Sequence, residues 1–263
     1  MNILDKIVAQ KKREVAKLPP RKVTGEDLKR ALEVAHGPRP FLPALQRPPR
    51  GSIALIAEVK KASPSAGVIC PEFDPVRIAL EYEAAGAACL SVLTDEPFFQ
   101  GSLEDLRRVR HAVSLPLLRK DFIIDEQQIL EAVENGADAI LLIARILNDA
   151  QLELFHSLAV EAGLAALVEV HDEPELDRAL AAGADLIGIN NRNLDDFTVD
   201  LGTTERLAAK ISGHKFIVAE SGIHHRADVE RVERAGARAI LVGESLLRSP
   251  AGIGAQVSQL LGR

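Results

Sequence analysis

A glutamate and a lysine stand two residues apart at the end of an apolar segment, as Glu58 and Lys60 in the run 56–65. In a β-strand, side chains at positions i and i+2 lie on the same face. Burial of a carboxylate and an amine is costly, so such groups persist when they are paired or used. Because parallel α/β proteins keep their chemistry at the carboxyl ends of strands, this pair predicts acid-base chemistry at such an end.

Other apolar segments also end in polar side chains. Each such residue taken singly fits a structural ion pair or a turn as well as a site. Stability alone would predict Val or Ile at several of these positions, whereas amines and carboxylates that share one mouth shift each other's pKa and suit proton transfer near neutral pH. The residues are Glu58 and Lys60, Lys120 and Asp121, Glu169, Asn190 to Arg192, Glu220 to Gly222, and Gly243 to Ser245.

Short apolar segments alternate with helical patterns along most of the chain. Their lack of polar alternation indicates strands that are buried on both faces. Eight alternations in 263 residues predict a (β/α)8 TIM barrel. A doubly wound open sheet is the alternative, but residues 61–65 are not the glycine-rich turn that follows its first strand. The predicted strands are 53–60, 88–93, 117–121, 139–143, 166–170, 186–190, 216–220 and 239–243.

Four Gly-Ala steps, at Gly86, Gly136, Gly183 and Gly236, end helical patterns and precede strands, which suits left-handed helix caps. We expect one domain over 1–263, of which 1–50 is an N-terminal helical extension with helices at 2–17 and 25–35 and a proline-rich connector. The run Lys11-Lys12-Arg13 is interpreted as a solvated helix face rather than a binding patch.

The composition narrows the class of protein. A net charge of −6 and a pI near 5.7 argue against a nucleic-acid-binding protein. Cys70 and Cys89 form no CxxC, and no His cluster has ligand spacing, so neither a disulfide framework nor a metal site is predicted. The charged N-terminus lacks an apolar run for export or membrane spanning. We therefore expect a soluble cytoplasmic protein without a membrane partner.

The last two strands are followed by glycines where barrels commonly bind phosphate. Backbone N–H groups at Ser221-Gly222 and at Gly243 are suited to hold it. Glu244 is a poor neighbour for a phosphate unless its side chain turns away. The loop 61–71 exceeds a usual βα turn and is interpreted as a loop that closes over a phosphorylated ligand.

Several segments together resemble the indole-3-glycerol phosphate synthase family over the full length. Val59 and Ala62 depart from the family pattern. The resemblance implies a barrel enzyme of tryptophan biosynthesis, a carboxy-lyase that cyclises 1-(o-carboxyphenylamino)-1-deoxyribulose 5-phosphate with release of CO2 and water. The similar segments are IAEVKKASPSAG, LLRKDFIID, ALVEVHDEPEL, IGINNRNL, VAESGI and LVGESLLR.

The resemblance also implies roles for single residues. Lys120 is the implied general acid at the ketone, and Glu169 the group that stabilises the iminium or moves the later proton. It leaves open which of Lys60 and Lys120 donates the first proton. Glu58 would orient the lysines, Lys60 would lie near the anthranilate carboxylate, and Asn190 would hold a hydroxyl or that carboxylate; Arg192 would close an ion pair, and Ser63, Ser221, Gly222 and Gly243 would surround the phosphate.

Aromatic contacts with the anthranilate ring are assigned to Phe99 and Phe122, whereas Phe98 is interpreted as packing. His171, His224 and His225 are left without a catalytic role, because no nucleophile system accompanies them. No cofactor is expected, and the protein is expected to be a monomer or a weak homodimer. A phosphoribosylanthranilate isomerase would need a Cys and Asp pair at strand ends, and a non-enzymatic barrel would lose the rim charges.

Overall fold

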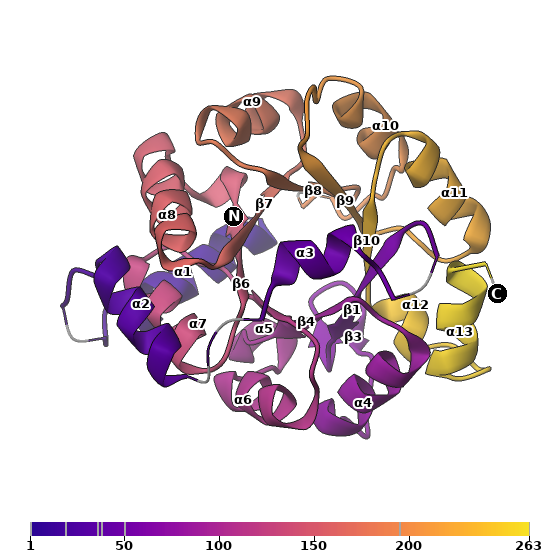
Figure 1. Cartoon of the computed structure of the whole chain (residues 1–263), viewed down its shortest axis with the longest axis horizontal. Helices are drawn as coiled ribbons and strands as arrows, with labels where there is room; N and C mark the ends of the chain where they lie inside the picture. The colour runs from indigo at the N-terminus through magenta and orange to yellow at the C-terminus, as the bar shows by residue number, and fades with distance from the viewer. Residues whose placement is uncertain are drawn as a thin grey trace.

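The computed structural model describes residues 2–18, 20–35, 37, 39–49, 51–194 and 196–262. In these residues, eight parallel strands close into a barrel, and each strand is followed by at least one helix on the outside (Figure 1). The predicted TIM barrel is confirmed. Three of the predicted strands have the observed bounds, and the others differ from them by one or two residues. The barrel strands are β1 (Ala54–Val59), β4 (Cys89–Leu93), β5 (Leu117–Lys120), β6 (Ala139–Ile143), β7 (Ala165–Val170), β8 (Leu186–Asn190), β9 (Phe216–Glu220) and β10 (Ala239–Val242).

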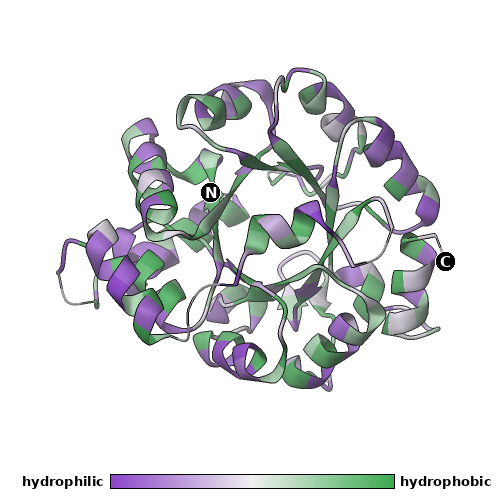
Figure 2. Ribbon diagram, viewed as in Figure 1, coloured by the Kyte–Doolittle hydropathy of each residue, from purple (hydrophilic) through white to green (hydrophobic). Residues whose placement is uncertain are grey.

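The helices outside the barrel bury one face each, and Figure 2 shows their apolar side turned to the strands. The four Gly-Ala glycines all have positive φ angles, as the helix-cap prediction requires. The outer helices are α4 (Pro75–Ala85), α6 (Leu103–Ala112), α7 (Glu126–Glu134), α8 (Asp149–Ala162), α9 (Glu173–Ala181), α10 (Gly202–Ala208), α11 (Arg226–Arg234) and α13 (Ile253–Leu260); shorter turns are α5 (Glu96–Phe99), η1 (Ala144–Ile146) and α12 (Glu244–Leu247).

The N-terminal extension contains α1 (Ile3–Val15), α2 (Gly25–Val34) and a further helix, α3 (Phe41–Gln46). Helix α3 lies in the segment that was described from the sequence only as a proline-rich connector. Helix α3 lies across the amino end of the barrel in Figure 1, and Phe41 and Leu45 pack on the side chains inside it. Only six residues long and interrupted by Pro43, α3 has too little periodicity to be predicted.

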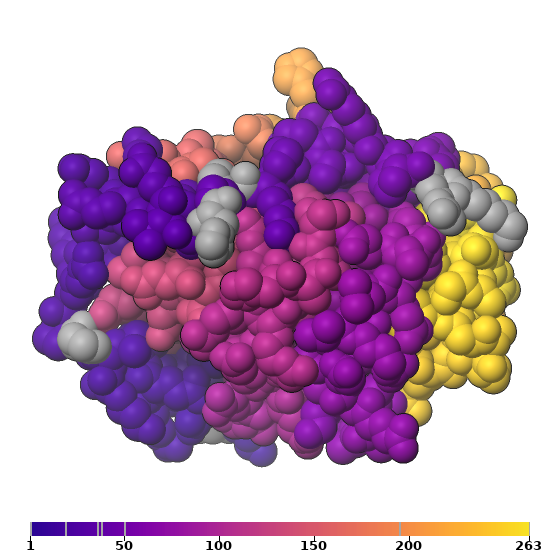
Figure 3. All heavy atoms as spheres, turned by 60° about the horizontal axis from the view of Figure 1, so that its bottom comes forward, coloured from indigo at the N-terminus to yellow at the C-terminus, as the bar shows by residue number. Residues whose placement is uncertain are grey.

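Helix α2 packs on α7 and α8, while α13 packs on α4. In Figure 3 the indigo beginning of the extension and the yellow C-terminal helix lie at opposite sides of the molecule. Two apolar clusters result, one between strands and helices and one inside the barrel. The extension thus adds packing both to the outside of the barrel and to its amino end.

Helix α1 reaches the other end of the barrel, where the strands finish. Ile3, Leu4 and Ile7 line the pocket at that end. Lys11 on the same helix is 4% exposed, and its ammonium contacts Asp95 and Asp121 at 3.0 and 2.9 Å. The prediction that Lys11 lies on a solvated face was therefore wrong, whereas Lys12 and Arg13 are exposed as expected.

Candidate active site

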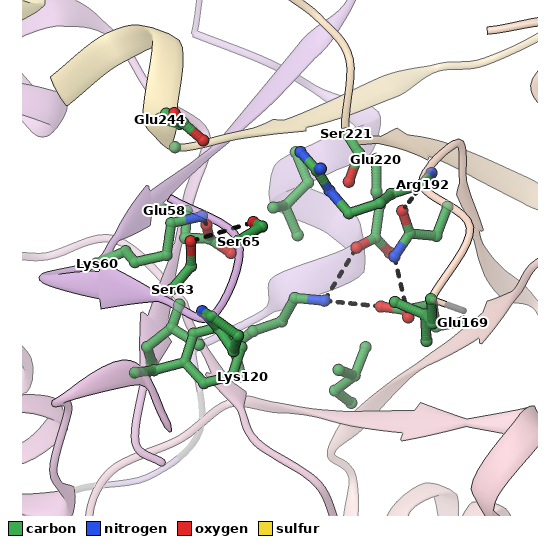
Figure 4. Close-up of a pocket in the computed structure, with 18 of the residues that line it drawn as sticks. Glu58, Lys60, Ser63, Ser65, Lys120, Glu169, Arg192, Glu220, Ser221 and Glu244 are labelled. Atoms are coloured by element: carbon green, nitrogen blue, oxygen red, sulfur yellow. Dashed lines mark hydrogen bonds and ion pairs between the residues drawn. The ribbon is translucent and has the colours of Figure 1, made fainter. Parts of the chain in front are cut away.

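A single pocket at the carboxyl end of the barrel brings together all twelve residues that the sequence assigned to a site. They come from the ends of seven of the barrel strands and from the loops that follow them. Figure 4 shows the charged members converging on the centre of the pocket. The twelve are Glu58, Lys60, Ser63, Phe99, Lys120, Phe122, Glu169, Asn190, Arg192, Ser221, Gly222 and Gly243.

The centre of the pocket is the ammonium group of Lys120 at the end of β5. It donates hydrogen bonds to Glu169 Oε2 at 2.7 Å and to Glu220 Oε2 at 3.0 Å (Figure 4). Both carboxylates are almost fully buried, at 2% exposure each. One amine is thus shared by two carboxylates that come from β7 and β9.

These two carboxyl groups differ in their affinity for a proton. Burial favours the neutral form of Glu169, but the charge of Lys120 and the contact with His171 outweigh it and hold the pKa of Glu169 well below its usual range. Burial raises the pKa of Glu220 to about 7, against the opposing effect of Lys120. The pKa of Lys120 lies above its ordinary value, because the nearby glutamates outweigh burial. The trio of Lys120, Glu169 and Glu220 therefore contains one ammonium, one ionised carboxylate and one carboxyl group that titrates near neutrality.

Glu220 is a site residue that sequence reasoning recorded at a strand end but assigned no role. It is the last residue of β9, and Asn190 at the end of β8 is its register partner. A carboxylate as the last residue of a predicted strand was a signal that could have identified it. A Cβ on Gly188 would lie 2.2 Å from Glu220 Oε1, so the absence of a side chain there leaves room for the carboxylate.

The Glu58 and Lys60 pair exists as predicted, with 2.5 Å between Lys60 Nζ and Glu58 Oε1. Glu58 is buried while Lys60 is partly exposed to the pocket. The carboxylate lies against Gly243, where a Cβ would approach Glu58 Oε1 to 2.6 Å. A glycine at the end of β10 therefore leaves space for the buried carboxylate of β1.

Asn190 holds Glu169 from the side of β8. Its Nδ2 donates to Glu169 Oε1 at 3.1 Å, and its Oδ1 accepts the backbone N–H of Arg192 at 3.0 Å. The Arg192 guanidinium donates to the carbonyl of Phe197 at 3.3 Å. Asn190 is thus a direct partner of Glu169, while the ion pair expected for Arg192 stays a prediction.

The apolar wall of the pocket combines aromatic side chains with the N-terminal helix. The rings of Phe99 and Phe122 lie 5.9 Å apart between centroids, tilted by 38°. Ile3, Leu4 and Ile7 of α1 belong to the same pocket and were not predicted from the sequence. A flat aromatic group can therefore lie between a charged centre and an apolar wall.

The loops after β9 and β10 form a second polar corner. Ser221 and Gly222 have φ angles of 65° and 79°, the left-handed region that a glycine tolerates. A Cβ on Gly222 would lie 2.4 Å from Val199, so a larger residue does not fit. The Glu244 side chain pairs with Arg248, with 3.1 Å between Arg248 Nε and Glu244 Oε1.

The long loop after β1 forms a small antiparallel hairpin of β2 (Ala62–Ser63) and β3 (Gly67–Val68). Ser63 Oγ accepts the backbone N–H of Ala66 at 3.2 Å and lies 3.4 Å from Ser65 Oγ. Both serines line the pocket, as Figure 4 shows. The hairpin thus presents hydroxyl groups at the pocket edge.

Within the described ranges, no group of three or more His, Cys, Asp and Glu side chains is arranged to hold a metal ion. The same part of the chain contains no helix with the length and apolar character needed to cross a membrane. Cys89 is fully buried.

Comparisons with known proteins agree on one family. The family model described as indole-3-glycerol phosphate synthase matches residues 4–259. The indole-3-glycerol phosphate synthase of Desulfotalea psychrophila is 50% identical over 256 residues, which cover 94% of each chain. That of Neisseria gonorrhoeae is 48% identical over 260 residues, covering 98% of this chain and 99% of the relative.

Among solved structures, the chain is similar to an N-acetylmannosamine-6-phosphate 2-epimerase from Clostridium perfringens. The TM-score is 0.58 at 16% sequence identity, over 73% of this chain and 86% of that one. At this identity the likeness concerns the barrel fold alone.

Proposed function

The chain belongs to the indole-3-glycerol phosphate synthase family of carboxy-lyases, and from this premise we propose how its own residues carry out the ring closure. The proposed substrate is 1-(o-carboxyphenylamino)-1-deoxyribulose 5-phosphate. The products are indole-3-glycerol phosphate, CO2 and water. The observation that carries the proposal is the ammonium of Lys120 shared by Glu169 and Glu220 inside an aromatic-lined pocket.

The reaction begins when the ring carbon that bears the carboxylate attacks the ketone carbon of the sugar chain. The new carbon-carbon bond places negative charge on the ketone oxygen and positive charge on the anilino nitrogen as an iminium. Loss of CO2 returns the electrons of the broken bond to the ring. Loss of the former ketone oxygen as water, with one proton from the adjacent methylene, then completes the indole.

Lys120 is the proposed donor of the proton to the ketone oxygen. Its raised pKa keeps the amine charged in the free protein, so the proton is present when the substrate arrives. A ketone oxygen that replaces one carboxylate partner would receive that proton as the carbon-carbon bond forms. Positioned acid catalysis of this kind contributes about 10²- to 10⁴-fold.

Glu169 is the proposed counter-charge to the iminium and the acceptor of the later methylene proton. Its low pKa keeps it ionised across the neutral range, which suits the electrostatic role. Asn190 fixes the carboxylate by donating to its other oxygen. Lys60, oriented by Glu58, is proposed to bind the anthranilate carboxylate and can supply a proton to the leaving hydroxyl.

The two ends of the substrate have separate proposed binding regions. Phe99 and Phe122 contact the anthranilate ring with the apolar residues of α1. Ser63, Ser221, Gly222 and Gly243 bind the phosphate through hydroxyl and backbone N–H groups, with Arg192 near them. No metal ion or organic cofactor is required by these steps, and turnover is expected to persist after dialysis against EDTA.

The first test is incubation of the purified chain with the proposed substrate, followed by indole absorbance and released CO2. Equimolar amounts of indole-3-glycerol phosphate and CO2 are expected. Formation of indole-3-glycerol phosphate without stoichiometric CO2, or no turnover at all, contradicts the proposal. A phosphoribosylanthranilate isomerase would produce neither signal from its own substrate.

The second test assigns the central amine. Lys120→Ala is expected to lower kcat by about 10²- to 10⁴-fold and to change product affinity by less than about tenfold, because the phosphate contacts lie elsewhere. Lys215→Ala, which removes an amine paired with Asp185 on the surface, is the matched control and should keep normal turnover. Near-normal kcat in Lys120→Ala would falsify the role of Lys120.

A further inference from the structure

Behind Glu169 lies a chain of charged side chains that the reaction scheme does not use. His171 follows Glu169 by two residues at the end of β7, and only 4% of its side chain is exposed. Its Nε2 lies 3.3 Å from Glu169 Oε1, and its Nδ1 lies 2.9 Å from Glu175 Oε2. Among the described residues that line the pocket, Glu169 is present and His171 is not, so the imidazole can reach the reaction only through Glu169.

Both neighbouring carboxyl groups are held in the ionised form by donors. Glu169 accepts from Lys120 on one oxygen and from Asn190 on the other. Glu175 accepts from Arg145 Nε at 2.6 Å on one oxygen and from the backbone N–H of His171 at 2.8 Å on the other. An ionised carboxylate has no proton to donate, so neither group can supply a hydrogen to the imidazole.

The imidazole therefore faces an acceptor at each nitrogen. A neutral histidine has one N–H and one lone pair, so one ring nitrogen would place its lone pair beside a carboxylate oxygen in a nearly dry environment. An imidazolium donates from Nδ1 to Glu175 and places positive charge 3.3 Å from Glu169 Oε1 at Nε2. The Nε2 contact is not aligned as a hydrogen bond, so its effect on Glu169 is mainly one of charge.

From this geometry we infer that His171 is a positively charged positioning residue, which keeps Glu169 ionised and directed at Lys120. The inference rests on the role proposed above for Glu169. The groups that surround the imidazole are Glu169 on β7, Glu175 and Asp172 at the start of α9, and Arg145 on η1, with Lys120, Asn190 and Glu220 beyond Glu169. Burial alone lowers the pKa of His171, but contacts with Glu169 and Glu175 outweigh it and raise the pKa to about 9.

The first experiment reads the charge of the imidazole without measuring activity. In ¹⁵N-edited NMR spectra of the whole protein, the His171 signals are assigned by their loss in His171→Gln. Both ring nitrogens should carry a proton at pH 7.5, with a midpoint near 9 that falls in Glu169→Gln. A wild-type midpoint at or below the ordinary histidine pKa of about 6.5 would overturn the inference.

The second experiment reads the effect on the reaction. His171→Gln replaces the cation by a neutral amide, so the pKa of Glu169 should rise and the acid limb of the kcat profile should move toward neutral pH. We expect kcat to fall about tenfold with KM little changed, because Glu169 loses the cation that directs it at Lys120. His156→Gln, at a half-buried histidine on α8, is the matched control and should leave the profile unchanged.

A double variant separates action through Glu169 from a general structural effect. If His171 acts through Glu169, His171→Gln should cost nothing further in a Glu169→Gln background. If the loss of kcat in the double variant equals the product of the losses in His171→Gln and Glu169→Gln, the two residues act independently and the inference is overturned. Full turnover in the Glu169→Gln single variant would overturn the proposed role of Glu169, and with it the effect of His171 on kcat. A neutral His171 in the NMR spectra would overturn only the inference about His171.

Discussion

Lys11 Nζ lies 2.9 Å from Asp121 Oδ1, although the two residues are more than a hundred positions apart in the sequence. Asp121 directly follows Lys120, and Arg119 pairs with the other oxygen of Asp121 at 3.0 Å. The charges of Arg119 and Lys11 outweigh burial and lower the pKa of Asp121 to about 2. The N-terminal helix is thereby tied to the strand that carries the central amine.

Lys11→Met should destabilise the protein, because it leaves Asp95 and Asp121 buried with one cation fewer. Loss of one member of a buried ion pair costs about 3 to 5 kcal/mol, and the remaining Arg119 contact favours the lower value. Lys12→Met, at an exposed neighbour on the same helix, should change the free energy of unfolding by less than about 0.5 kcal/mol. Equal midpoints of urea unfolding for the two variants would contradict the buried pair.

The raised pKa of Glu220 predicts that the free energy of unfolding decreases as pH rises. Its pKa in the folded protein, about 7, lies above the ordinary glutamate value of 4.5, so the folded state holds a proton that the unfolded state has lost. Stability from this group is therefore present below pH 4.5 and is lost as pH rises to 7. Thermal unfolding of the wild type and Glu220→Gln should show the wild type losing stability relative to the variant across that window, and a constant difference would exclude the shift.

The raised pKa of His171 predicts a second loss of folding stability at higher pH. Its folded pKa of about 9 lies above the ordinary 6.5, so its stabilising contribution is complete below pH 6.5 and is lost as pH rises through 9. The shift corresponds to a contribution on the order of 3 kcal/mol. The melting temperatures of wild type and His171→Gln should therefore differ most near pH 6 and converge by pH 10. A difference in melting temperature that grows as pH rises would contradict the raised pKa of His171.

The hairpin after β1 is predicted to respond to ligand. Hydrogen exchange across residues 61–71 should slow when product is bound, because the loop then excludes water from the pocket. Gly67 has a φ angle of 65°, which proline cannot adopt, so Gly67→Pro should lower turnover more than product affinity. Unchanged exchange at saturating product would indicate a static loop.

Most of the barrel could be predicted from the sequence, because its elements are set by local patterns. Apolar segments bounded by helical periods located the strands, and the Gly-Ala steps located helix ends, since a left-handed cap needs no tertiary contact. The alternation of strand and helix then placed Glu58, Lys120 and Glu169 on one rim before any contact was known. All twelve proposed site residues accordingly meet in one pocket.

What the sequence could not provide was the partner of each buried charge. From the sequence, Lys11 was predicted to be a solvated lysine. In the structure α1 packs on the carboxyl end of the barrel, where ion pairs with Asp95 and Asp121 make the burial of Lys11 favourable. His171 gains significance only through Glu169 and Glu175, which meet it through the ends of β7 and α9. Helix periodicity and strand length are properties of neighbouring residues, whereas the charge state of a buried group depends on residues brought together from distant positions, and only the packed structure determines those.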